Sequence, residues 1–173
     1  MKPANARIML DGLIVGLIGY AVIAVFYGVL GLGTGGGVFR TAGVLGSALF
    51  YGARDGQLVA GPGPVFAANG LHLIVMLVLG LAAAWLVATA EGHPSFWYPV
   101  FFLFLSAFVL NYVAVLVLLT EVGHLVPWWS SALANLLAAV GMGAYLWWAH
   151  PRLREELRHL DERGFAPPPR DTA

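Results

Sequence analysis

Four apolar stretches, each long enough to cross a bilayer, constrain the fold of this chain more than any other feature. They cover residues 8–32, 70–90, 97–120 and 126–149. A spanning helix needs about 20 mostly apolar residues, and in lipid only helices and closed barrels satisfy their own backbone hydrogen bonds. The composition agrees, because 60% of the residues are hydrophobic and only 10% are charged. We therefore predict an all-α integral membrane four-helix bundle within residues 1–150.

Basic residues flank these stretches unevenly, and this bias predicts the topology. Seven of them lie before the first stretch or after the last, and two lie in the long connection 33–69. Positive charge favours the cytoplasmic side, so both termini should be cytoplasmic and the connection external. We expect a multi-pass protein of the bacterial inner membrane. The segment 151–173 should form a short cytoplasmic amphipathic helix, with leucines at 153, 157 and 160, and a disordered tail.

The connection 33–69 is predicted to be an insertion associated with the outer membrane surface. Its apolar part, 38–53, is too short to cross as a helix, so it should be re-entrant or lie on the surface. Arg54, Asp55 and Gly56 should end this helix with a turn, and Pro62 and Pro64 should make the return extended. Asn69 is then a candidate N-cap of the next span. The polar residues expected to make contacts in the insertion are Arg40, Arg54 and Asp55.

Small residues recur at helical spacing and predict close packing between helices. The first stretch carries Gly12, Gly16 and Gly28, and the second carries Gly80. The first two form a G-x-x-x-G pair, which serves either a dimer contact or packing within one bundle. Both alternatives remain open at the level of sequence.

Polar residues near the middle of the membrane form a second predicted cluster. Counted at about 1.5 Å per residue from the outer ends of their helices, Asn111 and Asn135 lie at a similar depth. Tyr20 and Gly80 fall near the same layer. We expect an interhelical polar cluster of Tyr20, Asn111 and Asn135. It would either hold the helices together by hydrogen bonds or contact a ligand such as a quinone.

Several activities are disfavoured by what the chain lacks. It has no cysteine and a formal net charge of zero, which disfavours thiolate chemistry and nucleic-acid binding. A G-x-G-x-x-G match at 31–36 follows a membrane span rather than a strand, so it does not predict a dinucleotide site. Asp11, Glu91 and Glu121 lie at helix ends, and Asp11 is interpreted as an interface anchor beside Arg7. No catalytic residue and no metal site are predicted.

Histidines provide the one candidate for cofactor binding. Haem b with two axial ligands needs imidazoles that face each other across the helices. His72 near the outer boundary and His124 in the outer connection form one candidate pair, and His93 with His150 forms another on the inner side. Interfacial histidines are also common as polar anchors, and no cofactor is the primary expectation.

Three stretches resemble recurring segments of an uncharacterised group of small four-span bacterial membrane proteins. They are residues 39–52, the Gly70-Leu71-His72 triplet, and 141–151, which ends in His150-Pro151. The resemblance implies a four-span topology and implies no activity.

The functional expectation is a non-enzymatic accessory or scaffold subunit of a larger membrane complex, such as an energy-transducing one. Its partners would be the lipid bilayer and other membrane subunits or further copies of itself, and not nucleic acid. The alternatives are a redox subunit that binds haem b or a quinone, and a passive carrier or pore for a neutral solute. Small-residue stripes and aromatic spans favour protein contacts, whereas no chemical motif favours catalysis.

Overall fold

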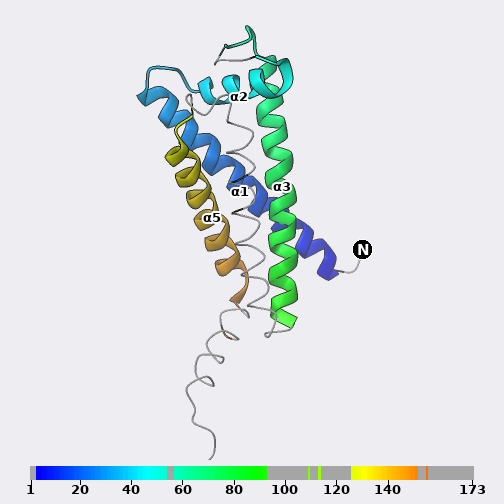
Figure 1. The fold of residues 1–173 in the computed structure, drawn as a ribbon. Coiled ribbons are helices and arrows are strands. Elements are labelled where there is room, and N and C mark those ends of the chain that lie inside the picture. Colours follow the sequence, from blue (N-terminus) through cyan, green and yellow to red (C-terminus); the bar gives the residue numbers. More distant parts are fainter. Residues whose placement is uncertain are drawn as a thin grey trace, which may run out of the picture.

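The computed structural model describes residues 3–53, 57–92, 109, 113, 126–151 and 155, and the regular structure among them is helical, with no strand (Figure 1). Four helices follow in order: α1 (Pro3–Gly33), α2 (Arg40–Tyr51), α3 (Gly63–Gly92) and α5 (Trp128–Ala149). Three of them contain segments long and apolar enough to cross a membrane, namely Ala6–Gly33, Gly63–Glu91 and Trp128–Ala149. The prediction of an all-helical, multi-pass membrane protein is therefore confirmed. The predicted stretch 97–120 lies, apart from Val109 and Val113, outside the described residues, as does nearly all of 151–173.

Helix α1 is the element around which the other described spans pack. It contacts both α3 and α5, whereas α3 and α5 contact each other only slightly. Figure 1 shows α1 crossing α3 obliquely, so that α1 begins at the end of the molecule where α3 and α5 finish. Side chains of all three helices meet in two buried apolar clusters: Val15, Ala83, Met142 and Leu146 in one, and Ile23, Met76, Ala134 and Ala138 in the other.

Helix α3 begins earlier than the sequence predicted. It starts at Gly63 rather than at residue 70, so Pro64 lies in its first turn and Asn69 lies inside it. A proline is tolerated there because the first backbone N–H groups of a helix have no partner within the helix. The expected non-helical return is therefore wrong at Pro64, whereas Pro62 lies before the helix, and the expected N-cap at Asn69 is wrong. The Asn69 amide instead donates to the Val65 carbonyl, with 2.9 Å between Nδ2 and O.

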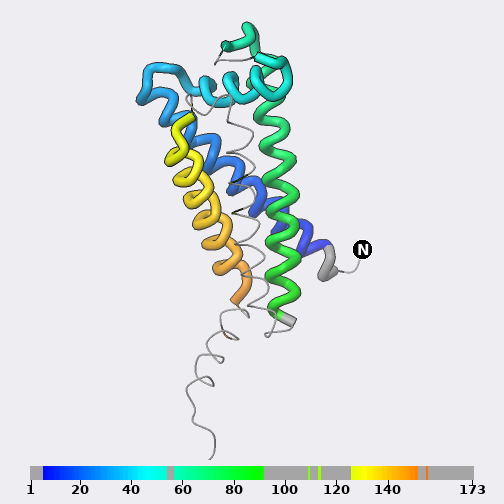
Figure 2. Tube along the Cα trace, viewed as in Figure 1, coloured from blue at the N-terminus to red at the C-terminus, as the bar shows by residue number. Residues whose placement is uncertain are grey.

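Helix α2 lies across the ends of α1 and α3, and Figure 2 shows the chain turning through it between them. Its buried face is made of small or slender residues, which are Gly43, Val44, Gly46 and Ser47. Gly46 rests directly against the Pro64 carbonyl, a contact that leaves no room for a side chain. The Ser47 hydroxyl oxygen accepts a hydrogen bond from the Val59 N–H at 3.0 Å, which ties the returning chain to the helix.

The end of α2 also differs from the prediction. The helix stops at Tyr51, and Gly52 follows in the left-handed conformation with φ of 65°, which glycine adopts without steric cost. The turn expected at Arg54, Asp55 and Gly56 is therefore not what ends the helix, and these three residues lie outside the described ones. Arg40, the remaining predicted contact of the insertion, is exposed and folds back over Gly36.

Candidate functional site: a buried polar junction

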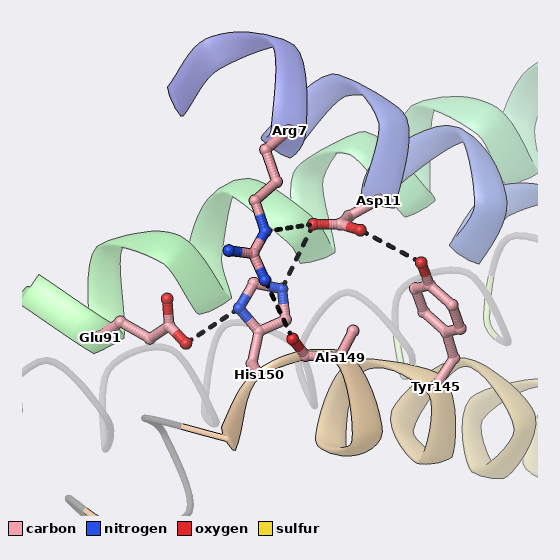
Figure 3. Close-up of polar contacts among 6 residues, drawn as sticks. All are labelled: Arg7, Asp11, Glu91, Tyr145, Ala149 and His150. Atoms are coloured by element: carbon pink, nitrogen blue, oxygen red, sulfur yellow. Dashed lines mark hydrogen bonds and ion pairs between the residues drawn. The ribbon is translucent and has the colours of Figure 1, made fainter. Parts of the chain in front are cut away.

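Five polar side chains meet at the end of the molecule where α1 begins and α3 and α5 finish (Figure 3). Arg7 and Asp11 come from α1, Glu91 from α3, and Tyr145 from α5, while His150 directly follows α5. We call these five residues the polar junction. It brings together three described spans that are far apart in sequence.

His150 owes its position to the residue that follows it. A residue before proline is disfavoured in the helical region, and His150 has φ of −118° and ψ of 73° before Pro151. Its backbone N–H still closes the last turn of α5 on the Leu146 carbonyl at 3.0 Å. The helix therefore ends here, and the imidazole, in a residue that is only 4% exposed, lies between α1 and α3.

The imidazole of His150 faces two carboxylates from different helices. Its Nδ1 lies 3.0 Å from Oε1 of Glu91, and its Nε2 lies 3.7 Å from Oδ2 of Asp11. The first distance is a hydrogen bond, whereas the second is a longer ion-pair contact. His150 thus connects α1 and α3 at the point where α5 ends.

Asp11 is buried, with 7% of its surface exposed, and its two oxygens differ in their surroundings. Oδ1 accepts a hydrogen bond from the Tyr145 hydroxyl at 3.1 Å. Oδ2 lies 3.7 Å from Nε of Arg7, whose Nη2 donates to the Ala149 carbonyl at 3.2 Å. Among the described residues, Oδ2 of Asp11 and Nε2 of His150 have no hydrogen-bond partner. These two atoms face each other.

This geometry adds to the interpretation of Asp11 as an interface anchor, which stays a prediction. The expected contact with Arg7 is present, and the carboxylate is also directed toward Tyr145 of α5 and toward His150. A signal for the junction did exist in the sequence. Asp11 lies about two turns from the start of α1, whereas Glu91 and His150 lie at the ends of α3 and α5. In the predicted topology these are the cytoplasmic ends of all three spans, so a count of depth places the three residues in one layer. His93, the predicted partner of His150, lies outside the described residues.

A smaller polar group lies between α1 and α3, closer to α2. The Tyr20 hydroxyl donates to Oδ1 of Asn69 at 3.3 Å, and the rings of Tyr20 and His72 lie 5.5 Å apart between centroids. The Nε2 atom of His72 is buried and has no hydrogen-bond partner among the described residues. His124, its predicted companion, lies outside those residues.

The predicted cluster of Tyr20, Asn111 and Asn135 is only partly described. Tyr20 pairs with Asn69, which sequence reasoning had placed at a helix cap, and Asn111 lies outside the described residues. The Asn135 amide donates to the Ser131 carbonyl one turn earlier in α5, at 2.8 Å. The expected hydrogen bond between Asn111 and Asn135 remains a prediction.

The glycines of the first two predicted spans form the crossing of α1 and α3. A Cβ atom added at Gly16 would lie 2.7 Å from the Leu77 Cα, and one at Gly12 would lie 2.7 Å from the Leu81 Cα. Gly80 faces the backbone of Gly12 and Gly16. The G-x-x-x-G pair therefore serves packing within the chain, and Gly80 does not share the layer of Tyr20. Gly28 is less crowded, because a Cβ added there would lie 3.3 Å from Cγ1 of Val38.

The polar junction can support acid–base chemistry and can hold helices together. Among the described residues, no three histidine, aspartate or glutamate side chains are placed to hold a metal ion. The two carboxylates and the imidazole can exchange protons, and together with the guanidinium they can hold helices in register. Comparison of the chain with protein-family models, curated proteins and solved structures gives no match.

Proposed function

We propose that the chain is a non-enzymatic accessory or scaffold subunit of a larger membrane assembly. The observation that carries this proposal is the polar junction, because its side chains contact partners on other helices of the same chain. Buried groups used in this way fix the arrangement of helices. A fixed arrangement is what a subunit needs in order to present a constant surface to its neighbours.

The outer end of the chain supports the same proposal. Large apolar side chains are exposed on and beside α2, including Phe39, Leu49, Phe50 and Tyr51. The small residues of α2 face α3 and the returning chain, so Phe39, Leu49 and Phe50 are available to lipid or to another subunit. The Tyr51 hydroxyl, in contrast, lies beside Gly63 at the start of α3. Exposed apolar patches of this kind commonly mark interaction surfaces.

The proposed topology has four spans, with both termini in the cytoplasm of a bacterium and α2 at the outer surface of its inner membrane. Helices α3 and α5 run in the same direction, away from α2, as Figure 1 shows. The end of α3 and the start of α5 therefore lie toward opposite ends of the molecule, which supports the proposal that the stretch 97–120 is a fourth span. Helix α5 has 22 residues and a length of about 33 Å. The exposed pairs Trp128 with Trp129 and Trp147 with Trp148 lie at its two ends, as interfacial anchors do.

Reporter fusions test this topology. We expect alkaline phosphatase, which is active only outside the cytoplasm, to be active when fused at Gln57. Green fluorescent protein fused after Ala173 should fluoresce, because the C-terminus is cytoplasmic in the four-span arrangement. If the fluorescent-protein fusion after Ala173 is dark and a phosphatase fusion at the same position is active, the C-terminus is outside. That result would indicate three spans and contradict the proposal.

Native gel electrophoresis followed by mass spectrometry tests the scaffold proposal directly. After gentle solubilisation of membranes, we expect the full chain to migrate in a complex with at least one other membrane protein or with further copies of itself. Leu49→Ser combined with Phe50→Ser on α2 should reduce the amount of this complex. A matched control is Trp148→Ser at the other end of the molecule, which should leave it unchanged. A chain that migrates only as a monomer contradicts the proposal.

A second candidate function is a redox subunit that binds haem b or a quinone. The observation that favours it is the buried Nε2 of His72, which has no partner among the described residues and lies beside the Tyr20 ring. A Soret absorption band in the purified protein, lost in His72→Ala, would replace the scaffold proposal with this one.

A further inference from the structure

The two ring nitrogens of His150 cannot both be satisfied by a neutral imidazole when Asp11 and Glu91 are ionised. A neutral ring has one N–H donor and one lone pair, whereas an imidazolium has two donors. Each nitrogen of His150 faces a carboxylate oxygen, which accepts hydrogen bonds and donates none. If the single proton lies on Nδ1, it bonds to Glu91, and the Nε2 lone pair then points at Oδ2 of Asp11. Two electron-rich atoms would face each other in a buried place.

We propose that the polar junction is a proton-binding site, in which His150 takes up a proton from water and donates to Glu91 and Asp11 at once. Proton uptake breaks no covalent bond and needs no further reactant. It also balances charge, because one guanidinium and two carboxylates are otherwise left with a net negative charge in a poorly solvated place. This inference does not depend on the scaffold proposal.

The contacts around Asp11 leave one of its carboxylate oxygens able to accept a hydrogen bond from protonated His150. Its Oδ1 is occupied by the Tyr145 hydroxyl, so Oδ2 is the oxygen left to accept from Nε2 of His150. The separation of 3.7 Å shortens to a hydrogen bond with a movement of less than about 1 Å. The charged and titratable groups that face His150 from the described elements are Arg7 and Asp11 on α1, Glu91 on α3 and Tyr145 on α5.

A proton fits this site better than a metal ion. The buried junction atoms without a hydrogen-bond partner among the described residues are Oδ2 of Asp11 and Nε2 of His150. Glu91 lies against the other ring nitrogen, Nδ1, so the three side chains do not converge on one point, and no group of three among the described residues is placed to hold a metal ion. Zinc sites use three or four protein ligands. The guanidinium of Arg7 also lies 3.7 Å from Oδ2, where it would repel a divalent cation. A proton needs only one donor and one acceptor.

Nuclear magnetic resonance of the full chain, labelled with ¹⁵N-histidine in detergent micelles, tests the proposal. The His150 signals are assigned by their loss in His150→Gln. Between about pH 5 and about pH 9 we expect both ring nitrogens to be protonated at the acidic end. Nε2 should lose its proton on titration, because Nδ1 stays bonded to Glu91. A His150 ring that remains neutral over the whole range overturns the proposal without any further variant.

Isosteric variants then identify the groups that hold the proton. At the acidic end of the range, Asp11→Asn and Glu91→Gln should each reduce the fraction of His150 that is protonated on both nitrogens, because each removes a negative charge beside the imidazolium. His72→Gln is the control and should leave this fraction unchanged. Equal fractions in the wild type and both junction variants would contradict the proposal. A shift of the His150 signals on addition of ZnCl₂, with the His72 signals unaffected, would assign the site to a metal ion instead and overturn it.

Discussion

Replacing Gly80 by valine is expected to destabilise the protein by about 2–3 kcal/mol, since the added side chain enters the crossing of α1 and α3. The atoms that a Cβ at Gly80 would meet belong to the backbone of Gly12 and Gly16. A backbone cannot rotate away as a flexible side chain can, so the two helices have to separate. The contacts that their close approach permits would then be lost. Unfolding of the purified protein in mixed micelles with increasing dodecyl sulfate, followed by circular dichroism, measures the loss.

Gly143→Val is the matched control for this experiment. Gly143 lies in α5, is exposed, and has no atom of the described residues within 4 Å of an added Cβ. The same side chain is introduced into a helix in both variants, so the difference in helix propensity cancels. We expect Gly143→Val to change stability by no more than about 0.5 kcal/mol. Equal losses in the two variants would show that the crossing of α1 and α3 does not depend on its glycines.

The glycine crossing also shows where sequence reasoning succeeds and where it fails. Spacing along one helix identified Gly12 and Gly16 as packing positions, because a repeat of four residues is a local property. Gly80, in contrast, was predicted to lie in the layer of Tyr20, whereas it faces Gly12 and Gly16. That estimate of depth assumed upright helices and a start of α3 at residue 70, whereas α1 is oblique and α3 begins at Gly63. Tilt depends on packing between helices, which no single segment encodes.

The apolar spans themselves were easier to predict than the polar junction. Hydropathy depends on the segment alone, so the extents of α1 and α5 follow closely from the apolar stretches. Asp11 and Glu91, in contrast, were judged one at a time at helix ends. The cost of burying each is offset by groups on other helices, and this offset becomes visible only when the helices are placed together.

Replacing His150 by leucine is expected to be the most damaging single change, with a loss of about 3–5 kcal/mol in the same unfolding assay. The reason is that Asp11 and Glu91 would remain near each other without the imidazole that contacts both. An ionic group that loses its partner in a buried place costs more than the pair contributes when intact. His72→Leu serves as the control, because Nε2 of His72 has no hydrogen-bond partner among the described residues. We expect it to cost about 1 kcal/mol or less.

A third variant separates lost charge compensation from lost packing. When Asp11→Asn and Glu91→Gln accompany His150→Leu, no ionised carboxylate remains in the polar junction, and Arg7 is exposed enough to be solvated, with 67% of its side chain accessible. Most of the stability lost in His150→Leu should then return, because replacing a whole buried ionic group is far less costly than removing one member. If the triple variant is as unstable as the single one, the imidazole stabilises the end of α5 by its shape. The two carboxylates would then contribute little to the packing of the three helices.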